Sequence, residues 1–134
     1  MRNHGGKHLR KILIVGGDDA LLSSLTEELE SRDFEVLPTH FGDGGLSLFR
    51  KDGPFAFALA DYRFIPGVKV KDCMQLVTAI HLNNPFQPMA IMTADPKEAR
   101  EKLPQALRYL PVLRKPFRIE QLLRLLRQPV LPLH

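Results

Sequence analysis

Three short apolar runs, each ending in a small or polar residue, place the strongest constraint on the fold of this chain. Each run predicts a buried strand because it is short and rich in apolar side chains. The runs occupy residues 11–15, 57–61 and 91–94. Asp61 ends one run, Thr93 lies at the end of another, and Lys115 follows a further apolar segment. Parallel strands end at a common edge of their sheet, so we expect these three side chains to form a site that handles a phosphoryl group.

Length and composition predict one globular domain. The chain has 134 residues, of which 44% are hydrophobic and 25% charged, values that suit a single core. No run approaches the roughly 20 apolar residues of a membrane-spanning helix, so we expect no membrane partner. Residues 1–10 contain no apolar signal segment and are interpreted as a flexible leader. Cys73 is the only cysteine, which excludes an internal disulfide and fits a reducing cytoplasm.

The charge of the chain is moderately positive. The formal net charge is +4 and the isoelectric point is about 9.5, so an anionic partner is one interpretation. The positive residues become denser only toward the C-terminus, and aromatic residues do not alternate with them. A surface that stacks single-stranded nucleic acid needs such aromatic residues. The pattern therefore does not favour a nucleic-acid partner.

Predicted strands and helices alternate along the chain. Hydrophobic spacing supports the helices, as in the last one, where Ile119, Leu122 and Leu126 share a face. Pro104 interrupts the helix that opens at Asp95. The predicted strands cover residues 11–16, 34–37, 55–60, 88–92 and 109–113. The predicted helices begin near residues 18, 43, 70, 95 and 117. Four of them end near residues 32, 51, 82 and 127, and the one that begins near residue 95 is short or broken.

This alternation predicts an α/β fold: a single doubly wound domain with a five-stranded parallel sheet flanked by five helices. Right-handed crossovers favour a flavodoxin-like strand order. Ligands of such sheets bind where the strand order reverses, which places Gly16, Gly17 and Asp61 at one crevice. The domain is expected to span residues 11–128, with a tail at 129–134 and no output domain after it. A stand-alone regulator and a domain of a longer protein both remain open.

Each candidate site residue has a second interpretation. Asp61 at the rim of the sheet is a nucleophile toward phosphorus, or a residue that caps the following turn. Thr93 donates its hydroxyl to a phosphoryl oxygen, or caps the helix that begins near residue 95. Lys115 pairs with Asp61, aided by a cis bond to Pro116, or is a surface lysine before a helix.

The order of these segments resembles the receiver domains of two-component response regulators, over residues from about 11 to 127. The matching segments are residues 12–15, 61–67, 92–94 and 115–117. The resemblance implies that Asp61 accepts a phosphoryl group from a histidine kinase or phosphotransfer protein, while Thr93 and Lys115 contact that group. It also implies an acidic pair that holds Mg²⁺ together with Asp61, and a downstream protein partner.

The chain departs from the receiver pattern where that pattern needs metal ligands. Glycine occupies both positions of the acidic pair, at Gly16 and Gly17. Mg²⁺ prefers oxygen ligands in an octahedral shell, so Asp18 is the substitute ligand, beside Asp61, for a weakened metal site. Val112 stands where the family carries an aromatic residue. The loop after Asp61 is one residue longer before Pro66.

The two glycines also permit a phosphate-binding loop at the start of a helix. The sequence there is Val-Gly-Gly-Asp-Asp rather than G-x-G-x-x-G, and two acids at the helix start repel phosphate. A dinucleotide site is therefore not favoured.

Two hypotheses remain open. The first is a receiver that is phosphorylated on Asp61 with atypical or weakened Mg²⁺ chemistry. Its enzymatic activity would extend at most to phosphoryl acceptance and autodephosphorylation. The second is a pseudo-receiver that acts as a phosphorylation-independent protein-interaction module. The resemblance places a partner or homodimer face on the last helix, the fourth helix or the fifth strand. Leu125 is either an exposed contact there or a partly covered surface leucine.

Overall fold

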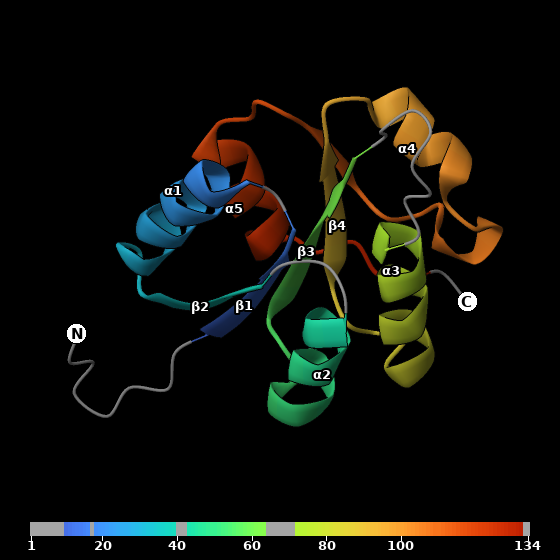
Figure 1. Cartoon of the computed structure of the whole chain (residues 1–134), viewed down its shortest axis with the longest axis horizontal. Coiled ribbons are helices and arrows are strands. Elements are labelled where there is room, and N and C mark those ends of the chain that lie inside the picture. Colours follow the sequence, from blue (N-terminus) through green and yellow to red (C-terminus); the bar gives the residue numbers. More distant parts are fainter. Residues whose placement is uncertain (1–9, 17, 40–42, 64–71, 133–134) are drawn as a thin grey trace.

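The computed structural model describes residues 10–16, 18–39, 43–63 and 72–132, and it is a three-layer α/β domain (Figure 1). The strands are β1 (Arg10–Val15), β2 (Phe34–Thr39), β3 (Phe57–Tyr62), β4 (Met89–Thr93) and β5 (Val112–Arg114). The helices are α1 (Asp19–Glu30), α2 (Asp43–Asp52), α3 (Asp72–Asn83), α4 (Pro96–Lys102) and α5 (Ile119–Arg127), with a 3₁₀ turn at Gln105–Leu107. No helix in these ranges is long and apolar enough to cross a membrane.

The strands form one parallel sheet in the order β2-β1-β3-β4-β5, as the alternating pattern predicts. In Figure 1, α1 and α5 lie together on one side of the sheet, while α2, α3 and α4 lie on the other. The strand order reverses between β1 and β3, so these two strands flank the switch point.

The hydrophobic core lies in two layers because side chains alternate between the faces of each strand. Phe57 and Leu59 of β3 pack under α1 and α5, whereas Ala58, Ala60 and Tyr62 pack toward α2, α3 and α4. Continuing this alternation places Asp61 on the same face as Phe57 and Leu59. Figure 1 shows that β3 lies inside the sheet, with β1 on one side and β4 on the other.

Several predicted boundaries are wrong in an informative way. The fifth strand begins at Val112 rather than residue 109, because Leu107 and Leu110 form turn hydrogen bonds to Pro104 and Leu107. Strand β3 continues through Asp61 and Tyr62, and α5 begins two residues later than predicted, at Ile119. The leader before residue 10, Gly17 and the loop that contains Pro66 fall outside the described residues.

Candidate functional site

Asp61 is completely buried near the carboxyl end of β3. The position at the rim of the sheet that the sequence predicts for this carboxylate is wrong, because the strand extends past residue 61 and side-chain cations cover both oxygens. Oδ1 lies 2.5 Å from Nζ of Lys115, and Oδ2 accepts a hydrogen bond from Nε of Arg63 at 3.2 Å. The structure therefore holds this carboxylate between two positive groups.

Lys115 reaches Asp61 because it directly follows the edge strand β5. Its backbone N–H donates to the carbonyl oxygen of Thr93 at 2.7 Å, and its peptide bond to Pro116 is cis, in line with the expectation from the sequence. The ion pair with Asp61 expected from the sequence is present. The short contact lacks hydrogen-bond geometry, since Oδ1 has no hydrogen-bond partner among the described residues. Lys115 thus balances Asp61 mainly through charge.

Arg63 is the site residue that sequence reasoning missed. It lies two residues after Asp61, a spacing that brings side chains to the same side of an extended segment. Its side chain is 45% exposed, so the guanidinium covers the carboxylate from the solvent side. A cation two positions beyond the candidate nucleophile was the available signal in the sequence.

Thr93 lies at the same end of the sheet but takes part in a different interaction. It is buried at the end of β4, opposite Tyr62 in the strand register. Its Oγ1 accepts a hydrogen bond from the backbone N–H of Asp95 at 3.1 Å. Within the residues that the structure covers, no hydrogen bond joins this hydroxyl to Asp61 or Lys115. This contact closes the turn before α4, whereas the helix cap that the sequence allowed for Thr93 is supplied by Asp95.

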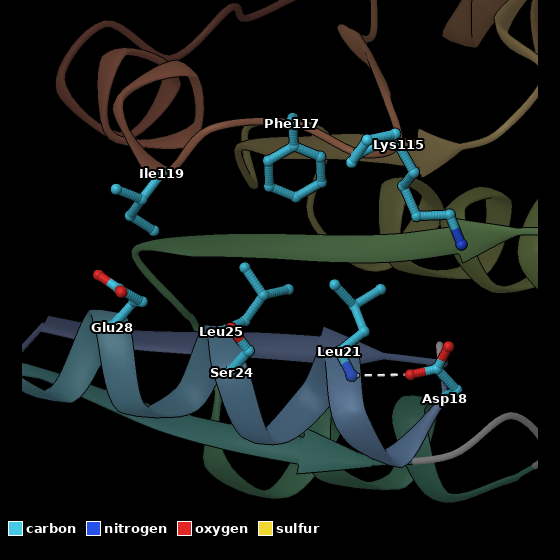
Figure 2. Close-up of a pocket in the computed structure, with 9 residues that line it drawn as sticks. Asp18, Leu21, Ser24, Leu25, Glu28, Lys115, Phe117 and Ile119 are labelled. Atoms are coloured by element: carbon cyan, nitrogen blue, oxygen red, sulfur yellow. Dashed lines mark hydrogen bonds between the residues drawn. The ribbon is translucent and has the colours of Figure 1, made fainter.

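Asp18 caps helix α1, and its carboxylate is exposed. Its Oδ1 accepts a hydrogen bond from the backbone N–H of Leu21 at 2.7 Å. Figure 2 shows Asp18 and Lys115 at the same end of a pocket of about 510 Å³ between α1 and the segment that leads into α5. The other lining residues are Leu21, Ser24, Leu25, Glu28, Pro116, Phe117 and Ile119. Within the described part of the chain, no hydrogen bond or ion pair links Asp18 to Asp61.

Comparison with known proteins identifies this architecture. No protein-family model and no curated protein sequence matches the chain. The chemotaxis protein CheY4 of Vibrio cholerae is similar in structure, at 20% identity and a TM-score of 0.77 over 92% of this chain and 100% of that one. This chain has the CheY-like fold of a response regulator receiver domain.

Two further receiver structures support the same fold. A CheY-like receiver domain protein from Methanospirillum hungatei JF-1 is 22% identical, with a TM-score of 0.76 over 90% of this chain and 93% of that one. A response regulator receiver protein from Sinorhizobium medicae WSM419 is 21% identical, with a TM-score of 0.69 over 90% of this chain and 96% of that one. The strand order and the five-helix arrangement predicted from the sequence are thereby confirmed.

The side chains at the receiver-fold site do not fit Mg²⁺. No group of three or more acidic, histidine or cysteine side chains gathers among the described residues. Gly16 offers no carboxylate, and its φ of 85° is a conformation that favours glycine. Asp18 is engaged as a helix cap, and both oxygens of Asp61 face cations. Mg²⁺ needs several oxygen ligands that are free to turn toward it, and this donor set supplies none of them without rearrangement.

Two other ionisable groups near the receiver-fold site are held in their neutral form. Burial, with a smaller contribution from the charge of Asp61, raises the pKa of the Cys73 thiol to about 12. Burial and the neighbouring Glu98 raise the pKa of Tyr62, whose hydroxyl donates to Oε1 of Glu98 at 3.3 Å. Neither group supplies an anionic nucleophile or metal ligand at neutral pH.

Val112 occupies the position at which receiver domains are expected to carry an aromatic residue. Val112 is half-buried and packs on the core layer of α2, α3 and α4. Tyr109, three residues earlier, packs on that same layer, and its hydroxyl lies 3.5 Å from Nδ1 of His81 in α3. An aromatic side chain therefore takes part in the packing near β5 but not from position 112.

Proposed function

We propose that this chain is a signalling domain of the two-component type that passes information by protein–protein contact, without metal-assisted phosphorylation of Asp61. The observation that carries the proposal is the enclosure of the buried Asp61 carboxylate by Lys115 and Arg63. The working unit is residues 11–128, acting in the cytoplasm on a downstream protein partner. A homodimer through the α4, β5 and α5 side is one form of such contact.

The enclosure opposes the chemistry of a phosphoryl acceptor. A carboxylate nucleophile must bring a free oxygen in line with the phosphorus atom. Oδ1 of Asp61 contacts Lys115 and Oδ2 contacts Arg63, so the attacking oxygen must first leave a cation. The incoming phosphoryl group also needs its charge neutralised, and the described residues contain no cluster of carboxylates that would hold a metal for this purpose. The geometry thus favours a structural role for the Asp61 ion pairs.

A second candidate is the phosphoacceptor receiver with weakened Mg²⁺ chemistry. It is favoured by the 2.5 Å contact between Asp61 and Lys115 and by the position of Thr93 at the end of the neighbouring strand. In this candidate a histidine kinase or phosphotransfer protein delivers the phosphoryl group to Asp61. Lys115 and Thr93 then contact the phosphoryl oxygens, and Asp18 joins Asp61 as a metal ligand.

Intact-mass measurement distinguishes the two candidates. The protein is incubated with phosphoramidate, with and without Mg²⁺, beside the Asp61→Asn and Asp95→Asn variants. We expect no gain of a phosphoryl group in any sample, because the Asp61 oxygens are held by cations. Asp95 is an exposed helix cap and serves as the matched acid control.

A Mg²⁺-dependent gain of one phosphoryl group would reverse this conclusion, provided that Asp61→Asn abolishes it and Asp95→Asn does not. The second candidate would then hold. Circular dichroism of each variant establishes that an unreactive protein is folded, and an ordinary receiver domain in the same buffer shows that the phosphodonor is active.

A further inference from the structure

We propose that Arg63 is a resident counter-cation that takes the electrostatic place of a divalent metal at Asp61. The inference rests on the proposed function, because it explains how this receiver fold maintains a buried carboxylate without a metal. A charge removed from water is costly unless it is paired and hydrogen-bonded. Asp61 is completely buried, and Arg63 makes its one hydrogen bond from a side chain within the described residues.

The local charge sets the sign of the ion that the site accepts. Asp61 contributes one negative charge, while Lys115 and Arg63 contribute two positive charges, which leaves one positive charge. A bound Mg²⁺ would add two further positive charges within a few ångströms of both side-chain cations. Coulomb repulsion at such separations is only partly screened, even at an effective dielectric constant of about 20. The site as built therefore repels a divalent cation.

Arginine is suited to this role because it combines a permanent charge with directional donors. Nε–H of Arg63 points to Oδ2 at 3.2 Å, while Lys115 acts on Oδ1 as a point charge. Each oxygen of the carboxylate is thus contacted by one of the two cations. Arg63 is the outer of the two, with 45% of its side chain exposed against 20% for Lys115, so it stands on the side from which an ion would enter.

The end of the neighbouring strand β1 is engaged in a backbone interaction. Gly16 donates its backbone N–H to the carbonyl oxygen of Thr39 at 2.8 Å and has a φ of 85°. A side chain at this position is strained, so an acid is not accommodated there without cost. Glycine at position 16 and arginine at position 63 act in the same direction, since both disfavour a metal ion at this site.

A charge reversal at Arg63, compared with a matched reversal elsewhere, tests the inference. Arg32 is the control because it also pairs with one carboxylate, Oε2 of the exposed Glu28 at 2.7 Å. Thermal unfolding is followed for the wild type, Arg63→Glu and Arg32→Glu. Each protein is measured without Mg²⁺ and with about 10 mM Mg²⁺, a level chosen to fill weak carboxylate sites, at constant ionic strength. We expect Arg63→Glu to lower the melting temperature by about 5 °C without Mg²⁺ and to regain at least half of that loss with it.

The wild type and Arg32→Glu should respond to Mg²⁺ by less than about 1 °C. Arg63→Glu melting like Arg32→Glu, with no response to Mg²⁺, would overturn the inference and leave the proposed function standing. If Mg²⁺ raises the melting temperature of the wild type as much as that of Arg63→Glu, the result would overturn both the inference and the proposed function, because both require a site that works without a metal. If Arg63→Glu does not fold, Arg63→Met replaces it, and a melting temperature equal to that of Arg32→Met would likewise overturn the role of Arg63.

Discussion

Replacing Lys115 by methionine should lower the free energy of unfolding by about 3 kcal/mol, as measured by urea denaturation at neutral pH. Lys115 lies 2.5 Å from a carboxylate that has no exposed surface. Removing one partner of a buried pair leaves an uncompensated charge, which is more destabilising than the pair is stabilising. The effect is placed at the lower end of the usual range because Arg63 still holds Oδ2 of Asp61.

Two companion variants show whether this loss comes from the Asp61 charge. Lys97→Met removes an exposed lysine of α4 and should change the free energy of unfolding by less than about 0.5 kcal/mol. The double variant Lys115→Met, Asp61→Asn removes both charges and should recover most of the loss. A double variant as unstable as Lys115→Met would mean that Lys115 acts through packing and not through Asp61.

Replacing Leu122 by alanine should cost about 3 kcal/mol of stability in the same urea measurement. Leu122 is completely buried and belongs to the core layer that β1 and β3 share with α1 and α5. Truncation leaves a cavity between α5 and the sheet, and the packed neighbours fill it only in part. The short segment from Lys115 to α5 depends on this packing, so the Asp61 site should loosen as well.

Leu125 provides the matched control for this cavity. It is half-buried and packs at the margin of the same core layer, which confirms the interpretation of a partly covered surface leucine. Leu125→Ala should therefore cost only about 1 kcal/mol. Equal losses for the two leucines would show that α5 is not seated on the sheet through the face that contains Leu122.

The sheet was predictable from the sequence because its strands carry strong local signals. Residues 57–62 are uniformly apolar apart from Asp61, and the structure buries all of them. The helix start at Asp95 and Pro96 was equally clear, and Asp95 does cap α4 by accepting from the backbone N–H of Glu98 at 3.1 Å. Such signals arise within a few residues and do not depend on the rest of the fold.

The features that escaped prediction depend on contacts between distant segments. Tyr109 and Leu110 resemble the start of a strand, yet turn hydrogen bonds around Leu107 and Leu110 hold this segment in a turn before the sheet. The burial of Asp61 depends on Lys115, which follows a different strand of the sheet, and on Arg63, whose side chain contacts the other carboxylate oxygen. The identity of residue 61 alone could not predict this arrangement, because an aspartate at the end of a strand can lie either at the rim of the sheet or buried beneath other side chains.

In the proposed function, the Asp61 site responds to its surroundings differently from a metal-dependent one. The two cations that contact Asp61, Lys115 and Arg63, both belong to the chain. A two-state switch needs a ligand or modification with different affinity for its two states. In the proposed function this differential binding comes from the protein partner rather than from an ion at Asp61.

The most direct test of this account is a titration of the wild-type protein with Mg²⁺ at constant ionic strength, followed by the backbone amide resonances of Asp61, Tyr62 and Lys115. The account predicts no saturable shift of these resonances up to about 10 mM Mg²⁺, because the three charged groups of the site already sum to a positive charge. A saturable shift that is centred on these residues and lost in Asp61→Asn would contradict it, and would show that the receiver fold here retains a metal site.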